Sequence, residues 1–120
     1  MTGPRFAFQP PDEDARPPAE VRLVDLAVQP YADGRRVRVL VELTSFQQPP
    51  NLEIQLSAAD GEVVSLTHII ETAVAQLSFT MHIRSATAVG PFTAAVRLYY
   101  PDLDSVDERQ VTFETPPASG

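Results

Sequence analysis

Residues 75–100 read AQLSFTMHIRSATAVGPFTAAVRLYY, and this stretch decides the fold of the chain. Two runs in which apolar and polar residues alternate flank a short connection that contains Gly90 and Pro91. A period of two places the apolar residues of each run on one face of a β-strand. The apolar positions are Leu77, Phe79, Met81 and Ile83 in the first run and Phe92, Ala94, Val96, Leu98 and Tyr100 in the second. We therefore expect two central strands of the core here.

Further short apolar runs surround this pair. They are residues 21–29, 37–43, 52–56, 62–70 and 111–113. In the first of them the alternation slips near Val24 and Asp25, which predicts a β-bulge. Turn signals that end in Gly34 and Gly61 separate neighbouring runs. Seven short strands without helical periodicity predict an all-β fold, an antiparallel seven-stranded sandwich with Greek-key topology.

One segment is open to a second interpretation. Residues 67–75 follow the irregular run 62–70, and their apolar residues also fit one stripe of a helix. Those residues are Ile69, Ile70, Ala73 and Val74. We favour a strand followed by a loop and keep a local helix as the alternative.

Residues 89–99, VGPFTAAVRLY, resemble the entry into strand F of fibronectin type III and related immunoglobulin-like domains. In those families a turn glycine is followed by an aromatic residue, often a corner tyrosine, and then by an alternating strand. Phe92 stands at the place of that tyrosine, so the corner hydrogen bond cannot form. The resemblance implies an immunoglobulin-like fold and a non-catalytic module for interaction or spacing. A shared fold does not by itself imply a shared activity.

The distribution of proline predicts the domain boundaries. Residues 1–19 carry Pro4, Pro10, Pro11, Pro17 and Pro18, and this density opposes both helix and sheet pairing. We expect a disordered Pro-rich tail over 1–19, a β-sandwich domain over 20–114 and a flexible tail over 115–120. Phe6 and Phe8 in the first tail either cover the domain's own surface or form a docking motif for a partner.

Composition excludes several classes of function. The 120 residues include no cysteine, and all nine basic residues are arginine, so disulfides, thiolate catalysis and lysine Schiff bases are excluded. A net charge of −7 argues against a nucleic-acid partner, because phosphate binding needs clustered cations. No run of 18 apolar residues is present, and the N-terminus has no apolar signal segment, so we expect a cytoplasmic protein without a membrane partner. We expect no cofactor.

The densest acidic group lies in residues 101–108. Asp102, Asp104, Asp107 and Glu108 supply the oxygen ligands that hard cations such as calcium prefer. The spacing lacks the glycine of an EF-hand, so we favour a solvated hairpin loop. A domain that binds calcium or a small ligand through this loop is the alternative.

The remaining titratable residues do not form a catalytic pattern. His82 should project outward from its strand, His68 lies in the irregular run, and no serine has the setting of a nucleophile elbow. We therefore expect no enzyme. Arg35, Arg36 and Arg38 are typical of a strand surface that deters edge pairing, with binding of the acidic residues 12–14 as the alternative.

The outward face of residues 92–100 is the candidate binding surface. We expect the strands of residues 52–56 and 111–113 to flank it, as in immunoglobulin-like sheets. Tyrosine and arginine are the residue types most enriched at interface hot spots. The predicted binding residues are Arg97, Tyr99, Thr93 and Gln55. The expected partner is another protein or a second copy of the chain, which would form a homodimer.

Overall fold

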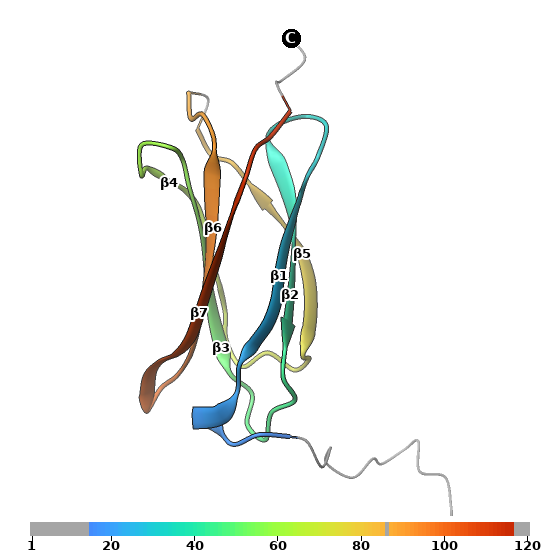
Figure 1. Cartoon of the computed structure of the whole chain (residues 1–120), viewed down its shortest axis with the longest axis vertical. Coiled ribbons are helices and arrows are strands. Elements are labelled where there is room, and N and C mark those ends of the chain that lie inside the picture. Colours follow the sequence, from blue (N-terminus) through green and yellow to red (C-terminus); the bar gives the residue numbers. More distant parts are fainter. Residues whose placement is uncertain (1–14, 86, 117–120) are drawn as a thin grey trace, which may run out of the picture.

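The computed structural model describes residues 15–85 and 87–116 and contains seven antiparallel strands in two packed sheets (Figure 1). The strands are β1 Leu23–Pro30, β2 Arg36–Leu43, β3 Asn51–Ser57, β4 Val63–Ile69, β5 Gln76–His82, β6 Phe92–Tyr100 and β7 Leu103–Phe113. One sheet has the order β1-β2-β5 and the other the order β4-β3-β6-β7. The seven-stranded antiparallel sandwich is therefore confirmed.

The chain changes sheets three times. It crosses from β2 to β3, returns from β4 to β5 and crosses again from β5 to β6. These crossings place β6 between β3 and β7, although β3 and β6 are far apart in sequence. Figure 1 shows the two layers side by side, with the three-stranded sheet on the right.

The alternation in the sequence sets the faces of most strands. The inward residues of β2, β3 and β6 are all buried, and they form one core between the sheets. They are Val37, Val39, Val41, Leu43, Leu52, Ile54, Leu56, Phe92, Ala94, Val96, Leu98 and Tyr100. The predicted bulge in β1 is also confirmed, because the pairing with β2 shifts between Leu23 and Asp25.

The expectation that both strands of residues 75–100 are central is wrong for the first one. β6 has a hydrogen-bonded strand on each side, whereas β5 pairs only with β2 and forms the edge of its sheet. Met81 is buried, but Leu77 and Phe79 are only half-buried, because no strand covers the outer side of β5. The alternation correctly predicted which face of β5 points to the core, but it did not predict that Leu77 and Phe79 are only partly buried.

The ambiguous segment is a strand followed by a loop, so the helical alternative is wrong. β4 continues to Ile69, which pairs with Leu52 of β3. The chain then turns at Glu71, whose φ is 51° and whose amide donates to Oδ1 of Asn51 at 2.8 Å. The ladder with β3, the Asn51 side chain and the Pro50 carbonyl, which accepts from the Thr72 amide at 3.0 Å, give backbone groups of this segment partners without a helix.

Within the described residues, Ala15 and Arg16 already contact the domain, upstream of the predicted boundary at residue 20: Nε2 of Gln47 donates to the Ala15 carbonyl at 3.1 Å. The Arg16 amide donates to the Ser45 carbonyl at 3.0 Å, and the Gln47 amide donates to the Arg16 carbonyl at 2.9 Å. A short 3-10 helix, Pro18–Glu20, then leads toward β1. Phe6, Phe8 and the acidic residues 12–14 lie outside the described residues. In the part of the chain that the structure describes, no helix has the length and hydrophobicity to cross a membrane.

Candidate interaction face

The acidic residues expected in a loop lie mostly in β7. Only Pro101 and Asp102 form the turn after β6, and β7 begins at Leu103, so the loop interpretation is wrong. The ladder between β6 and β7 continues through the acidic segment, so these residues form a strand. Asp107 shares a row with the inward residue Leu98, whereas Glu108 shares a row with the outward residue Arg97.

The strand geometry therefore separates the carboxylates of the predicted calcium site. Neighbouring residues of a strand point to opposite faces of the sheet. Oδ2 of Asp107 accepts a hydrogen bond from the Leu23 amide at 2.9 Å, which joins β7 to the bulged start of β1. Within residues 15–85 and 87–116, no group of three or more His, Asp or Glu side chains is placed to hold a metal ion.

The predicted binding residues lie together on the outer face of the four-stranded sheet. As expected, β3 and β7 flank β6. Three rows of paired residues cross these strands: Ser57, Thr93 and Thr112; Gln55, Ala95 and Gln110; and Glu53, Arg97 and Glu108. We call these three rows, together with Tyr99 beside Arg97, the β6 face.

Arg97 is held in place by two neighbours. Its Nη2 donates to Oε1 of Glu53 at 2.7 Å, and its guanidinium lies 4.4 Å from the centre of the Tyr99 ring. Hydrogen bonding to the Glu53 carboxylate raises the pKa of Arg97 above its ordinary value, and the smaller effect of burial opposes this. A charge-assisted hydrogen bond and a cation–π contact together restrict the guanidinium to one orientation. The Arg97 side chain is still 37% exposed.

The row that contains Glu53, Arg97 and Glu108 continues onto a fourth strand, β4. His68 of β4 pairs with Glu53, and its Nε2 lies 3.9 Å from Oε1 of Glu53. Sequence reasoning placed Glu53 beside β6 but missed its contact with Arg97 and the place of His68 in this row. Only the registers of β4 with β3 and of β3 with β6 bring these residues together, and no local pattern encodes them.

A hollow of about 340 Å³ lies next to Arg97. Ala95 forms part of its floor, and the amide side chains of Gln55 and Gln110 lie in the same row on either side. The small methyl group of Ala95 between two longer side chains leaves this space. The hollow thus offers amide donors and acceptors, and charged side chains of both signs also line it: Glu53, Arg97, Glu108 and Arg109.

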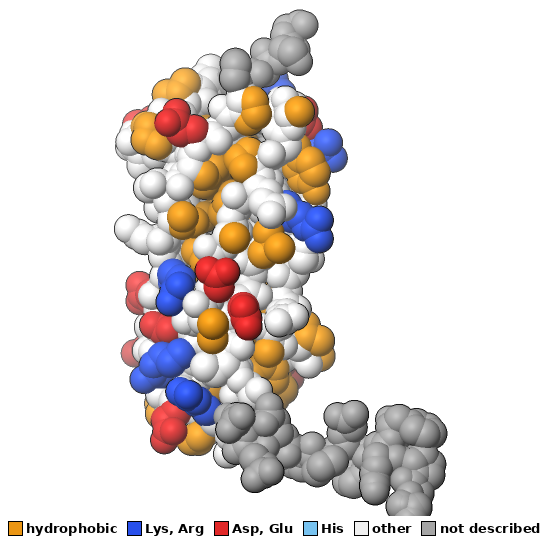
Figure 2. Space-filling view, turned by 45° about the vertical axis from the view of Figure 1, so that its right-hand side comes forward, with side chains coloured by type: hydrophobic (Ala, Val, Ile, Leu, Met, Phe, Trp, Pro, Cys, Tyr) orange, Lys and Arg blue, Asp and Glu red, His pale blue; other side chains and the backbone are white. Residues whose placement is uncertain are grey.

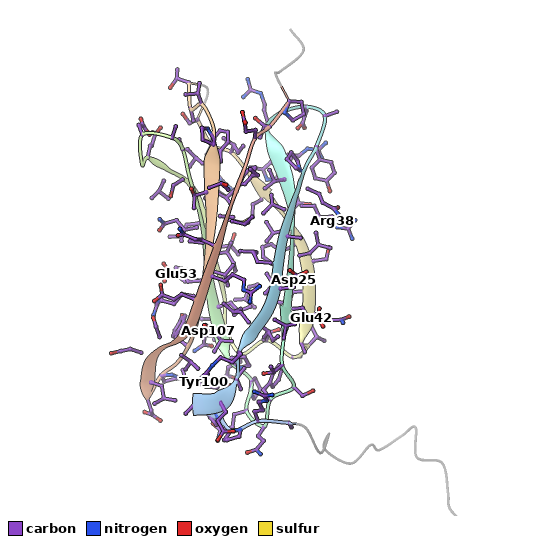
Figure 3. All side chains as sticks on the ribbon, viewed as in Figure 1. Asp25, Arg38, Glu42, Glu53, Tyr100 and Asp107 are labelled. Atoms are coloured by element: carbon purple, nitrogen blue, oxygen red, sulfur yellow. The ribbon has the colours of Figure 1, made fainter. Side chains whose placement is uncertain are left out.

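The other candidate residues lie on the three-stranded sheet. His82 is exposed at the end of β5, as predicted for its face. Nε of Arg36 pairs with Oδ2 of Asp33 at 2.7 Å, and hydrogen bonds from Arg35 and Arg36 lower the pKa of Asp33. Figure 3 shows Arg38 projecting from this sheet, on the opposite side of the molecule from Glu53.

No protein-family model and no curated protein matches this chain. A solved β-glucuronidase from Bifidobacterium dentium resembles 82% of this chain with 19% of its own, at a TM-score of 0.64 and 18% identity. A β-glucuronidase from Ruminococcus gnavus resembles 80% of this chain with 16% of its own, at a TM-score of 0.54 and 16% identity. A glycosyl hydrolase family 2 member from Bacteroides cellulosilyticus is similar over 78% of this chain and 14% of its own (TM-score 0.58, 12% identity). The chain spans less than a fifth of these enzymes. At this identity, the likeness shows a shared β-sandwich fold.

Proposed function

We propose that this chain is a non-catalytic, immunoglobulin-like module that binds another protein through the β6 face. The observation that carries the proposal is the state of Arg97, which is fixed by Glu53 and Tyr99 and still exposed. A side chain that is already ordered loses little conformational entropy on binding. Arginine and tyrosine are also common binding hot spots.

The surroundings of Arg97 indicate the chemistry of the partner. The guanidinium has five N–H donors, so donors remain after the bond to Glu53. A carboxylate or carbonyl group of the partner suits these donors, and an amide or hydroxyl side chain suits the hollow between Gln55 and Gln110. The edge of the Tyr99 ring adds apolar contact area.

The structural neighbours support a modular role. Their matching parts are between 14% and 19% of longer chains in the three enzymes described above. The alternative of a calcium-dependent domain lacks comparable support, because Asp107 and Glu108 point to opposite faces of β7.

The test compares the proteins retained by immobilised wild-type chain and by its Arg97→Ala and Tyr99→Ala variants from the extract of the native organism. Arg84→Ala is the matched control, because Arg84 is exposed and lies outside the β6 face. We expect at least one protein to bind wild type and the control but neither variant.

Thermal melting establishes that all variants are folded before the comparison is made. If both folded variants retain every protein that wild type binds, the β6 face is not the binding surface and the proposal fails. Sedimentation of the same variants reports whether this face joins two copies of the chain instead.

A further inference from the structure

The outer face of the three-stranded sheet has opposite charges at its two ends. Three rows of paired residues cross β1, β2 and β5 there: Gln29, Arg38 and Thr80; Ala27, Leu40 and Ser78; and Asp25, Glu42 and Gln76. We call these three rows the β2 face. The first row carries a cation, the second is largely apolar, and the third carries two carboxylates.

The two carboxylates are direct cross-strand neighbours. Asp25 pairs with Glu42 in the ladder between β1 and β2, and like charges in this position destabilise a sheet. Among the residues that the structure describes, no ion pair joins either carboxylate to a cation. A hollow of about 380 Å³ adjoins both, and Leu40 and Leu77 form part of its lining. The face therefore combines two carboxylates that have no ion-pair partner among the described residues with accessible apolar surface.

Arg38 lies at the other end of the same face. Its Nε donates to the Ser78 hydroxyl at 2.7 Å, which leaves the terminal nitrogens of the guanidinium for another acceptor. Arg36 differs from it, because Asp33 and the Tyr31 ring already engage its guanidinium. Figure 3 shows Arg38 on the same side of the molecule as Asp25 and Glu42, and displaced from them along the strands.

The order of charges along β2 is self-complementary. Arg38 and Glu42 lie about 13 Å apart along the strand, with Leu40 midway between them. Two copies can be related by a two-fold axis that lies in the interface, passes beside Leu40 and crosses the strands at right angles. This axis reverses the direction of the strands in the second copy. Such an axis places Arg38 of each copy opposite Glu42 of the other and brings the two Leu40 side chains together.

We propose that two copies of this chain associate through their β2 faces about this axis. The same operation places Gln29 opposite Asp25 of the second copy, so an amide donor meets the second carboxylate. A two-fold axis parallel to the strands would instead place Arg38 against Arg38 and Glu42 against Glu42. Repulsion between these like charges selects the first arrangement.

The size of the face limits the affinity. The whole outer side of the sheet, of which the β2 face is part, has three strands about 4.8 Å apart and eight residues at about 3.3 Å each, which gives a flat area of roughly 14 by 26 Å at most. This is roughly 360 Å² per copy, well below the roughly 800 Å² per partner of a standard specific interface. The dimer should therefore be weak and reversible, with a Kd on the order of 10–100 µM. Figure 2, which turns this side forward, shows neighbouring acidic groups with hydrophobic side chains above them, and basic groups both higher on the right and to the left of the acidic groups.

Charge-reversal complementation tests the arrangement, measured by sedimentation of the full chain over a range of concentrations. Arg38→Glu and Glu42→Arg should each weaken the homodimer at least about tenfold, because each creates two like-charge contacts across the two-fold axis. An equimolar mixture of the two variants should form a heterodimer, and the double variant Arg38→Glu/Glu42→Arg should recover the homodimer. Arg84→Glu and Glu62→Arg are matched controls at exposed positions outside the face.

Three results would overturn the proposal. The first is a wild-type chain that stays monomeric at about 1 mM, which is ten times the upper expected Kd. The second is single variants that dimerise as well as wild type. The third is a mixture of folded variants that does not associate. If a reversal unfolds the chain, Glu42→Gln replaces it and should weaken the dimer by a smaller factor. None of these changes alters the β6 face, so failure here leaves the proposed function untouched.

Discussion

β5 and β6 have nearly the same sequence pattern but different environments. Each alternates apolar and polar residues, and each directs its apolar residues to the core. In β6 every inward residue is buried, whereas in β5 only Met81 of the inward residues within the strand is buried. The difference arises because β6 lies between β3 and β7, and β5 has only β2 beside it.

This contrast separates two properties of a strand: which of its faces is apolar, and how deeply that face is buried. Alternation determines which face of a strand is apolar, because successive side chains point to opposite sides. The depth of that face depends on how many strands and opposing side chains cover it. Equal substitutions in the two strands should therefore have unequal effects on stability.

The largest effect is expected in β6. Leu98 is fully buried between the sheets, so Leu98→Ala should lower the free energy of unfolding by about 3 to 5 kcal/mol through lost burial and a cavity. Urea denaturation of wild type and variant measures this change. A loss below that for a half-buried residue of β5 would contradict the assignment of β6 as the central strand.

A smaller effect is expected at Phe79 in β5, although phenylalanine is the larger residue. Because Phe79 is only partly buried beside the open edge, Phe79→Ala should cost about 1 to 3 kcal/mol, less than full burial would imply. Gln76→Ala is the control on the opposite face of the same strand and should change stability by less than about 0.5 kcal/mol, because Gln76 is exposed. Equal losses at Phe79 and Leu98 in urea denaturation would show that β5 is as well covered as β6.

The smallest effect concerns the end of β6 and depends on pH. The Tyr100 hydroxyl donates to the Gln48 carbonyl at 2.8 Å, and burial raises the pKa of Tyr100 above the ordinary value of 10.0. Above that pH the unfolded tyrosine loses its proton while the folded one retains it. The stabilisation is thus present below pH 10 and is lost as the pH rises through the folded pKa.

Tyr100→Phe isolates this contribution. At neutral pH the variant should lose only about 1 kcal/mol, since one hydrogen bond is removed. Above pH 10 the free energy of unfolding, measured by urea denaturation, should fall more steeply for wild type than for the variant. Equal slopes would mean that the Tyr100 hydroxyl is not buried in solution.

The candidate sites show a similar division between what was predictable and what was not. The outward position of Arg97 and Tyr99 followed from alternation, and the resemblance to immunoglobulin-like domains correctly placed β3 and β7 beside β6. The contact of Arg97 with Glu53 did not follow, because it depends on the register of two strands that are far apart in sequence. The acidic segment misled the sequence interpretation, because polar residues on an exposed edge strand have the composition of a loop.

The sequence by itself determined that there are seven strands, the inward faces of most of them, the bulge in β1 and the absence of thiol and lysine chemistry. These features depend on local alternation, turn residues and composition. Only the tertiary structure decided that β5 is an edge strand, that β7 extends through the acidic segment and that Asp25 lies opposite Glu42. Sheet order and register join residues that are distant in the chain, and they minimise the free energy of the whole core, so no short stretch of sequence specifies them.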